Sequence, residues 1–498
     1  MTNHLSRTRR LPSVIALLLI YAFTRLHHLL ALPLFIDESF HIETAQQAWR
    51  GHLLASATHG RLLRVWLNAI LGPDPPAAGW TTRAGTVLIG LLGAASFYAL
   101  ARAFASHRAG LIAAALWIGA PYLVFYERMA LADSLLGALS VVAVWSAWQM
   151  LQKGSCSWAV GLGAALALVI LAKASGVAWL PLPVAALLLA RGVPWHKRFV
   201  LGALAYGTLG LLWGPLALVL RWKGYDYFGL ASVFVGDQKE SLLHRISHNV
   251  SSVWHFDVAY VGLFVVLAAV LGGVYWIFKR PRTALFALLA LGMGGGGAIV
   301  FGNRINSRYA FNQVVWVLLP LAVGCALLIE RKPRWQPLVY GGIAVWMAVF
   351  CAPFLVTAWN HPADLPLYGN DLREYITYEA SGYGVTEIGQ ILKHGRERLP
   401  TLGFVASCQT LQLAAYPQDV TCPTIHWDGT SQNSIMQQAE KWAEKGPIYV
   451  VGENLTYIDL SELPQPYTVI TTVERPGSHM PVSLYRIAQG AKRPRTGG

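Results

Sequence analysis

The sequence predicts an α-helical polytopic membrane protein, a bundle of about eleven membrane spans with a small external α/β domain at its C-terminal end. The composition predicts the bundle, because 55% of the 498 residues are hydrophobic and only 13% are charged. The mean hydropathy of +0.44 agrees with this. A change to polar composition near residue 359 predicts the external domain. We expect domains at 1–358 and 359–490, followed by a disordered tail at 491–498.

Apolar runs near the length of one membrane crossing, about 20 residues, define the predicted spans. They lie at residues 12–33, 84–104, 109–126, 131–151, 158–172, 177–191, 199–220, 257–278, 283–302, 310–329 and 336–358. The first run lacks a small-residue cleavage site, so we take it as a span rather than a signal peptide. The fifth and sixth runs are short, so they could be two crossings or one re-entrant pair.

Basic residues predict the orientation. With the N-terminus in the cytoplasm, every cytoplasmic loop carries Lys or Arg, from Arg9 and Arg10 to Arg331 and Lys332, as the positive-inside rule requires. An odd number of spans then places the C-terminal domain outside the cytoplasm. We expect a multi-pass protein of the plasma (inner) membrane. The net charge of +14 is spread over short loops, so no nucleic-acid partner is expected.

The polar C-terminal part predicts a small mixed domain. Helical patterns near 384–397 and 431–445 alternate with strand patterns that begin near 401, 447, 467 and 482. Cys408 and Cys422 are close in sequence there, and outside the cytoplasm they could form a disulfide or remain free thiols.

Two adjacent acids, Asp37 and Glu38, follow the first predicted span, where the chain meets the external water layer. Carboxylates near the hydrocarbon boundary carry a desolvation cost, so a pair of them indicates a base, ligand or partner role. Service as counter-ions to nearby cations is the structural alternative. The two long outer loops, 34–82 and 221–256, could form a substrate surface.

Several cations remain at the outer ends of spans, where topology gives no reason for them. They are Arg61, Arg64, Arg83, Arg128, Lys173, Arg304 and Arg308. They outnumber the nearby acids, which are Asp37, Glu38, Glu127 and Asp133. This surplus indicates an anionic ligand such as a phosphate, although each cation could instead extend to the lipid headgroups.

The histidines of the first outer loop are possible metal ligands. His41, His52 and His59, together with Glu43, match no known ligand spacing. We therefore assign no metal site and no cofactor, and a requirement for a divalent metal stays open.

These features, in this order, resemble the membrane glycosyltransferases of the GT-C fold, in the group of the protein O-mannosyltransferases and the lipid A aminoarabinose transferases. The matching stretches cover roughly residues 12–330: FIDESFH with the acid pair, WTTRAGTVLIGLLG with Arg83, YERMALADSLLGAL with Arg128 and Asp133, LAKASG with Lys173, and SRYAFNQVVWVLLP with Arg308 and Tyr309. One departure is that Tyr126 and Glu127 precede Arg128, where the group often has a second Arg or a Ser. No motif of the C-terminal domain matches.

The resemblance implies transfer of one sugar from a polyprenyl-phosphate carrier to a hydroxyl of a lipid, glycan or protein acceptor on the outer face. Asp37 would be the general base, with inversion at the anomeric carbon, and Glu38 would orient Asp37 or the acceptor. The substrate-binding residues would be Arg83, Arg128, Lys173 and Arg308 for the phosphate, with Tyr309 beside them and Asp133 positioning a cation.

Two other functions stay open. A transporter or flippase of an anionic lipid or solute could use the same cations, but it would need charges near the middle of the membrane and symmetry between two halves. The external domain could instead be a sensor or assembly module.

Overall fold

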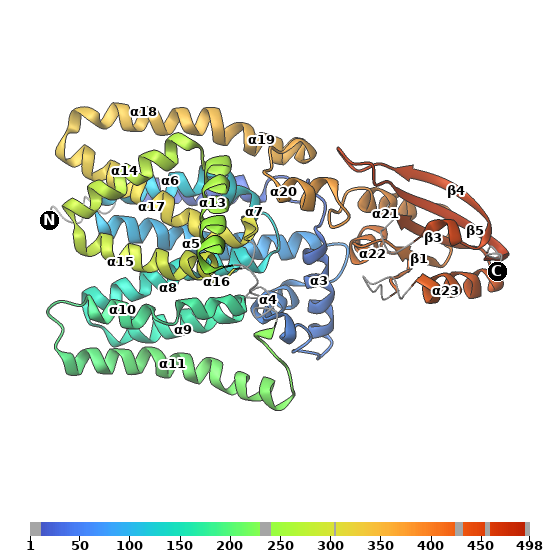
Figure 1. Ribbon diagram of the computed structural model, residues 1–498, viewed down its shortest axis with the longest axis horizontal. Coiled ribbons are helices and arrows are strands. Elements are labelled where there is room, and N and C mark those ends of the chain that lie inside the picture. The colour runs from blue at the N-terminus through green and yellow to red at the C-terminus, as the bar shows by residue number, and fades with distance from the viewer. Residues whose placement is uncertain (1–10, 230–240, 303–304, 424–431, 454–458, 494–498) are drawn as a thin grey trace. The chain divides into compact units, whose positions relative to one another are not determined.

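The computed structural model describes residues 11–229, 241–302, 305–423, 432–453 and 459–493 (Figure 1). It divides into two compact units. Unit 1 contains the described residues up to Leu29, together with Gln47–Leu71 and Thr82–Asn360. Unit 2 contains Leu30–Gln46, Gly72–Thr81 and the described residues from His361 onward. The C-terminal domain thus forms one unit with two short segments from the N-terminal part of the chain.

Unit 1 is a bundle of apolar helices. Among the described residues, six helical segments are long and apolar enough to cross a membrane: α5 Ala78–Phe104, α8 Ala132–Lys153, α11 Trp195–Trp222, α15 Pro281–Leu291 continued by α16 Gly297–Phe301, α17 Ser307–Arg331, and α18 Gln336–Trp346 continued by α19 Ala352–Asn360. Two bent pairs raise this number to eight if each pair is one span. They are α6 His107–Gly119 with α7 Pro121–Glu127, bent by 61°, and α13 Leu242–Val261 with α14 Leu263–Lys279, bent by 112°.

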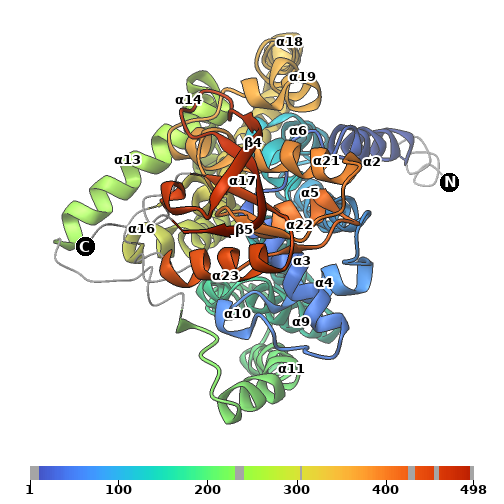
Figure 2. The same ribbon diagram turned by 90° about the vertical axis from the view of Figure 1, so that its right-hand side faces the viewer.

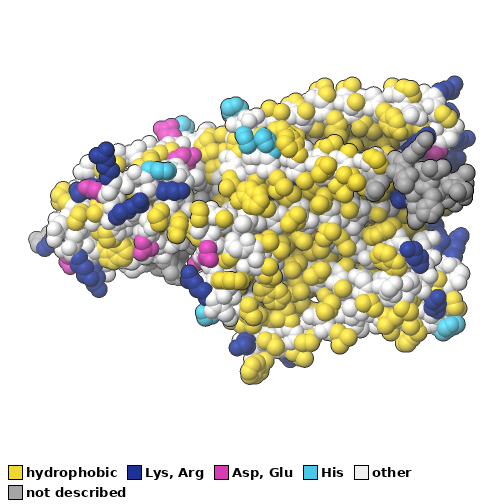
Figure 3. Space-filling model, turned by 180° about the vertical axis from the view of Figure 1, so that it is seen from behind, with side chains coloured by type: hydrophobic (Ala, Val, Ile, Leu, Met, Phe, Trp, Pro, Cys, Tyr) yellow, Lys and Arg dark blue, Asp and Glu magenta, His cyan; other side chains and the backbone are white. Residues whose placement is uncertain are grey.

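The shorter apolar helices of unit 1 are α2 Leu11–Leu26, α4 Leu62–Leu71, α9 Cys156–Ala172 and α10 Leu182–Leu188. Every predicted span overlaps a helix, and the prediction of about eleven spans counts α2, α9 and α10 as crossings. A multi-pass helical bundle is therefore confirmed. On the face shown in Figure 3, hydrophobic side chains cover most of unit 1, and Lys and Arg gather at one end of it.

The centre of the bundle is formed by α8 and α17. In their most apolar windows, 89% of α8 and 78% of α17 is buried, against 17% of α11 and 11% of the α18–α19 segment. Figure 2 shows α11 and α18 at opposite edges of the unit. The first turns of α8 and α17 carry Asp133, Arg308 and Tyr309, so these predicted site residues are attached to the best-packed helices.

One predicted span was wrong in its boundaries. The sequence suggested a crossing at 257–278, but α13 ends at Val261 and the chain turns at Gly262, whose φ is +96°. Only glycine adopts this backbone conformation readily. Residues 257–261 therefore extend the amphipathic α13, and the apolar α14 begins only after the bend. Residues 242–256, which were expected in an outer loop, are also helical.

The C-terminal part of unit 2 is a three-layer α/β domain. Its sheet has the strand order β2-β1-β3-β5-β4, with β1 parallel to β2 and β3 and with β5 antiparallel to β3 and β4. The strands are β1 Thr401–Phe404, β2 Val420–Thr421, β3 Ile448–Glu453, β4 Gln465–Val473 and β5 Val482–Lys492. The helices of unit 2 are α20 Asn370–Leu372, α21 Val385–His394, α22 Cys408–Ala415, α23 Gln432–Lys445, and residues 36–46 of α3 Ile36–Trp49.

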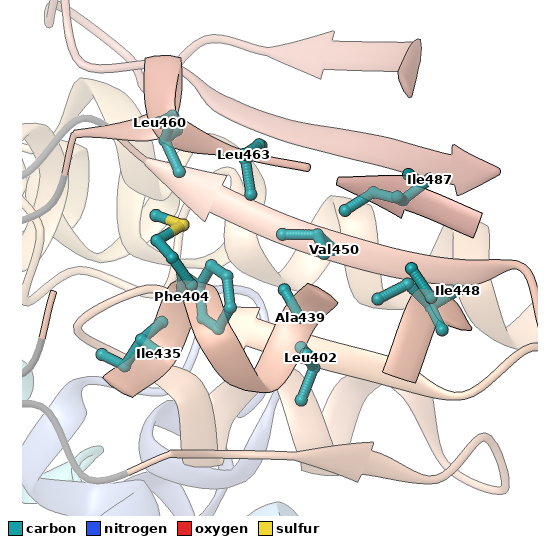
Figure 4. Close-up of a cluster of buried hydrophobic side chains, with 12 residues drawn as sticks. Leu402, Phe404, Ile435, Ala439, Ile448, Val450, Leu460, Leu463 and Ile487 are labelled. Atoms are coloured by element: carbon teal, nitrogen blue, oxygen red, sulfur yellow. The ribbon is translucent and has the colours of Figure 1, made fainter. Parts of the chain in front are cut away.

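Alternating strand residues build two cores in this domain. Leu402, Phe404 and Val450 pack with Ile435 and Ala439 of α23 (Figure 4). The opposite face of the sheet packs against α21 and α22. The small α/β domain predicted from period-two alternation is confirmed, while α22 and the two-residue β2 were missed. A disulfide joins Cys408 at the start of α22 to Cys422, just after β2.

Candidate functional site

The acid pair opens helix α3, which places both carboxylates in its first turn. The buried Glu38 carboxylate accepts a hydrogen bond of 3.0 Å from the backbone N–H of Phe35, the residue before the helix. A Glu at the third helical position often caps a helix in this way. Asp37 is partly exposed one residue earlier, at the positive end of the helix dipole. Glu38 therefore fixes the turn from which Asp37 projects.

A cationic cluster lies in unit 1 around Lys173. The Lys173 ammonium donates to Asp133 at 2.5 Å and lies 4.3 Å from the centre of the Tyr309 ring. The Arg308 guanidinium also lies over this ring and donates to the Tyr309 hydroxyl at 3.1 Å. Four of the predicted residues therefore meet in one place.

Electrostatics add Arg61 to this cluster. Burial lowers the pKa of Lys173, the charge of Asp133 opposes this effect, and the charges of Arg61 and Arg308 lower the pKa further. Asp133, Arg61 and Arg308 thus all act on the Lys173 ammonium, and a group of cations of this kind suits a phosphate. The first turns of two helices, α8 and α17, contribute to the cluster, and the N-terminal ends of helices favour anions as well.

Small residues explain how the LAKASG stretch presents Lys173. The chain leaves α9 with Lys173 in an extended conformation, and the N–H of Ala174 then donates to the carbonyl of Gly60 at 2.8 Å. A Cβ on Gly176 would overlap the backbone of Val169. Bulkier residues would open this turn and shift the ammonium group.

The structure places Arg128 and Arg83 in a different group, at the end of α2. Arg128 donates to the carbonyls of Thr24, Arg25, His27 and His28, with distances of 2.7–3.3 Å. Arg83 donates to the carbonyl of Leu29 at 2.9 Å. Terminal helix carbonyls are natural partners of cations. These contacts anchor both arginines to backbone carbonyls of unit 1, and their role in binding the phosphate stays a prediction.

A buried ion pair beside this group was missed. Arg25 of α2 donates to Glu127 at 2.9 Å, and both side chains are almost completely inaccessible to solvent. Glu127 also accepts from the indole N–H of Trp117 at 2.9 Å. The signal was present in the sequence, because an Arg near the end of an apolar run requires a counter-ion. Glu127 is therefore a partner of Arg25 in the core of unit 1.

A polar stripe on α13 was also missed. Arg245, Asn249 and Asp257 lie on its buried face at helical spacing, among apolar neighbours. Within the described ranges, Arg245 Nε, Asn249 Oδ1 and Asp257 Oδ1 are buried without a hydrogen-bond partner. The helical period of these polar residues was readable in the sequence once the segment was recognised as a helix.

Two further expectations concern Arg304 and metals. Arg304 lies outside the described residues. Within the part of the chain that the structure describes, no group of three or more His, Cys, Asp or Glu side chains could hold a metal ion.

Comparisons with known proteins identify the class of fold. The family described as dolichyl-phosphate-mannose-protein mannosyltransferase matches residues 76–216. No curated protein matches the chain. The architecture is that of the GT-C membrane glycosyltransferases, and the resemblance drawn from the motifs is confirmed at the level of the fold.

The structural similarity to ArnT from Cupriavidus metallidurans extends over nearly the whole of both chains. The structure of that protein bound to undecaprenyl phosphate matches with a TM-score of 0.63 and 15% identity, over 95% of this chain and 97% of that one. Its apo state matches with a TM-score of 0.64 and 16% identity, over 96% and 98%. AglB, an oligosaccharyltransferase from Archaeoglobus fulgidus in complex with an inhibitory peptide and a dolichol-phosphate, matches with 0.54 and 14%, over 90% and 70%.

Proposed function

We propose that this protein is a glycosyltransferase that moves a single sugar from a polyprenyl-phosphate carrier to an acceptor hydroxyl on the outer face of the membrane. The observation that carries the proposal is the fold, which is shared over nearly its full length with a protein bound to undecaprenyl phosphate. The cluster of Lys173, Arg61 and Arg308 around Asp133 supports it, because cations of this kind suit a lipid phosphate.

In the proposed reaction, the Asp37 carboxylate accepts the proton of the acceptor hydroxyl. The acceptor oxygen attacks the anomeric carbon with inversion, and the bond from that carbon to the phosphate oxygen breaks. The carrier phosphate leaves with the bonding electrons. Lys173 and Arg308 stabilise its developing charge, and Glu38 keeps Asp37 in place through the first turn of α3. A lipid-linked sugar arrives already activated, so the reaction needs no nucleotide-binding loop.

The proposal includes the sidedness of the reaction. We place the N-terminus in the cytoplasm and unit 2 outside it, in the plasma (inner) membrane, on the basis of the basic loops. The acceptor would be a lipid, a glycan or a protein with a free hydroxyl.

The direct test is release of the free carrier by the purified protein from a panel of polyprenyl-phosphate sugars, followed by mass spectrometry. Asp37→Asn is expected to lower turnover at least about 1,000-fold, because the amide cannot accept the proton. Binding of the lipid phosphate should change less than threefold. The exposed Asp74 provides a matched control, since Asp74→Asn removes an acid from unit 2 without touching the α3 turn. Full turnover by Asp37→Asn would remove Asp37 from the mechanism.

A further inference from the structure

Helix α22 contacts the beginning of α3 through a buried hydroxyl pair. The Thr410 hydroxyl lies 3.0 Å from the Ser39 hydroxyl and 3.4 Å from the carbonyl of Leu34. Ser39 in turn donates to the carbonyl of Ile36 at 2.9 Å. Both hydroxyl side chains are almost fully buried, with exposed fractions of 1% for Thr410 and 0% for Ser39. The chain of hydroxyls from α22 therefore ends on the peptide group that directly precedes Asp37.

A second contact lies one helical turn further along α3. The side chain of Gln409 of α22 lies near the carboxyl group of Glu43, which is half-buried. Burial raises the pKa of Glu43, and the nearby Gln409 side chain opposes this effect. Because Ser39 and Glu43 are four residues apart, they lie on the same face of α3. Thr410 thus bonds to the first turn of α3, and its neighbour Gln409 faces the next turn.

The chain before Asp37 is held by another part of the C-terminal segment. The N–H of Ile36 donates to the carbonyl of Ala380 at 3.1 Å. The Phe35 ring lies 4.6 Å from the Tyr375 ring, measured between centroids. Gly382 packs directly against the backbone of Leu34, where a Cβ would overlap the carbonyl oxygen. Asp37 is therefore flanked on both sides by residues that are fixed by the C-terminal domain.

Helix α22 is itself firmly anchored. Cys408, which precedes Gln409, forms the disulfide with Cys422, and Leu411 is fully buried in the core behind the sheet. Ser407 donates to the carbonyl of Glu379 at 2.7 Å. Because the first turn of α22 is held in this way, α22 can fix the position of the α3 turn that it contacts.

We infer that the C-terminal α/β domain is a working part of the active site, in which Thr410 is a positioning residue that sets the place of Asp37 through Ser39. The inference rests on the proposed role of Asp37 and extends it, because it assigns a catalytic contribution to a domain that contains no recognisable motif. Displacing a catalytic base by about 1 Å can lower the reaction rate about 100-fold. Loss of the single hydroxyl contact between Thr410 and Ser39 is therefore expected to lower turnover.

The test compares three variants of the full-length protein. Thr410→Val keeps the shape of the side chain and removes the hydroxyl, whereas Thr410→Ser keeps the hydroxyl. Thr472→Val is the matched control, because Thr472 forms the same kind of hydroxyl pair with Ser483 at 2.9 Å, on strand β4. We expect Thr410→Val to lower kcat about 10- to 100-fold with the donor KM changed less than about threefold. Thr410→Ser should recover kcat to within about threefold of wild type, and Thr472→Val should match wild type.

Hydrogen exchange of residues 36–43 gives a readout that does not depend on the reaction. Thr410→Val is expected to raise the exchange rates of these amides about tenfold or more, and Thr472→Val should leave them unchanged. Unchanged exchange, a wild-type kcat in Thr410→Val, or a failure of Thr410→Ser to recover would each overturn the inference. If the wild-type protein releases no carrier, the proposed function fails, and the exchange measurement still decides whether Thr410 holds α3.

Discussion

Arg128 shows that a charged side chain at the end of a predicted span can bind backbone carbonyls. Its guanidinium donates to four carbonyls at the end of α2, although the sequence suggested a phosphate ligand. Both interpretations follow from an arginine at the outer end of a span. The contacts with the carbonyls depend on long-range packing that sequence spacing does not encode, and phosphate binding by Arg128 stays a prediction.

Replacing Arg128 is therefore expected to affect stability first. Arg128→Gln should lower the free energy of unfolding by about 2–4 kcal/mol, because several buried carbonyls lose a charged donor at once. The measurement is the thermal unfolding temperature in detergent, with Arg191→Gln as a control at an exposed arginine. A variant with wild-type stability but weak donor binding would contradict this expectation and would support Arg128 as a ligand of the phosphate.

Lys173 is expected to behave differently. Its ammonium lies in a cluster with an excess of positive charge and between an acid and an aromatic ring. Lys173→Met should raise the donor KM about 10- to 100-fold, since a point charge on the phosphate is lost. The acceptor KM should change less than about threefold, which steady-state kinetics with each substrate varied in turn will show. Equal losses for donor and acceptor would argue against a phosphate site.

The sequence indicated the members of this cluster because they lie at the ends of three predicted spans, with Arg308 and Tyr309 adjacent at one of them. The sequence predicts Lys173, Asp133, Arg308 and Tyr309 as site residues, and the four meet in unit 1. Arg25 was missed because it lies inside an apolar run, where a charge was read as part of the span. The pairing of Arg25 with Glu127 depends on the packing of α2 against α6 and α7.

At the scale of elements, glycine allows α14 and α17 to pack closely. A Cβ on Gly324 of α17 would overlap the backbone of Gly272 on α14. Small residues at such positions let apolar helices approach until their backbones touch. This contact joins a peripheral helix to one of the two central ones.

Adding one methyl group at this contact should be costly. Gly324→Ala is expected to lower the free energy of unfolding by about 2 kcal/mol or more, because the backbone has no flexible side chain that could move aside. Gly273→Ala is the matched control on the same helix pair, since its nearest neighbour is a side-chain atom of Pro320 at 3.4 Å. Thermal unfolding in detergent should separate the two variants by several degrees, and equal melting temperatures would contradict the packing argument.

Local patterns predicted most of the elements, and long-range contacts account for the differences. Strands β1, β3, β4 and β5 and helices α21 and α23 lie where alternation and helical periodicity placed them. The bend at Gly262 was missed because hydropathy alone does not show a change of direction. Helix α22 is eight residues long, so its periodicity was too short to stand out.

At the scale of the whole molecule, the basic loops make a prediction about sidedness. Cys156 is an exposed free cysteine at the start of α9, on the side expected to face the cytoplasm. Lys441 is exposed on α23 in the domain expected outside. In intact cells, a membrane-impermeant maleimide should label Lys441→Cys and leave Cys156 unlabelled until the membrane is opened. The reverse pattern would invert the topology.

The set of chain segments that makes up unit 2 could not be predicted from the sequence. Its first two segments run from the end of the first predicted span into the loop that follows, and nothing in their local pattern links them to the C-terminal residues. The boundary predicted near residue 359 marks a change in polarity along the chain. A compact unit is instead defined by contacts in space, which can join segments that are distant in sequence.

The assembly of unit 2 from distant chain segments has a consequence for biosynthesis. The hydroxyls of Ser39 and Thr410 are separated by 371 residues, so at ordinary translation rates the first emerges from the ribosome roughly 20 to 70 s before the second. During that interval the Asp37 turn lacks the contacts that Ala380 and Thr410 later provide. Under the proposed function, transfer therefore begins only after the C-terminal segment has been synthesised and has packed against α3, and a polypeptide truncated before Thr410 would remain inert.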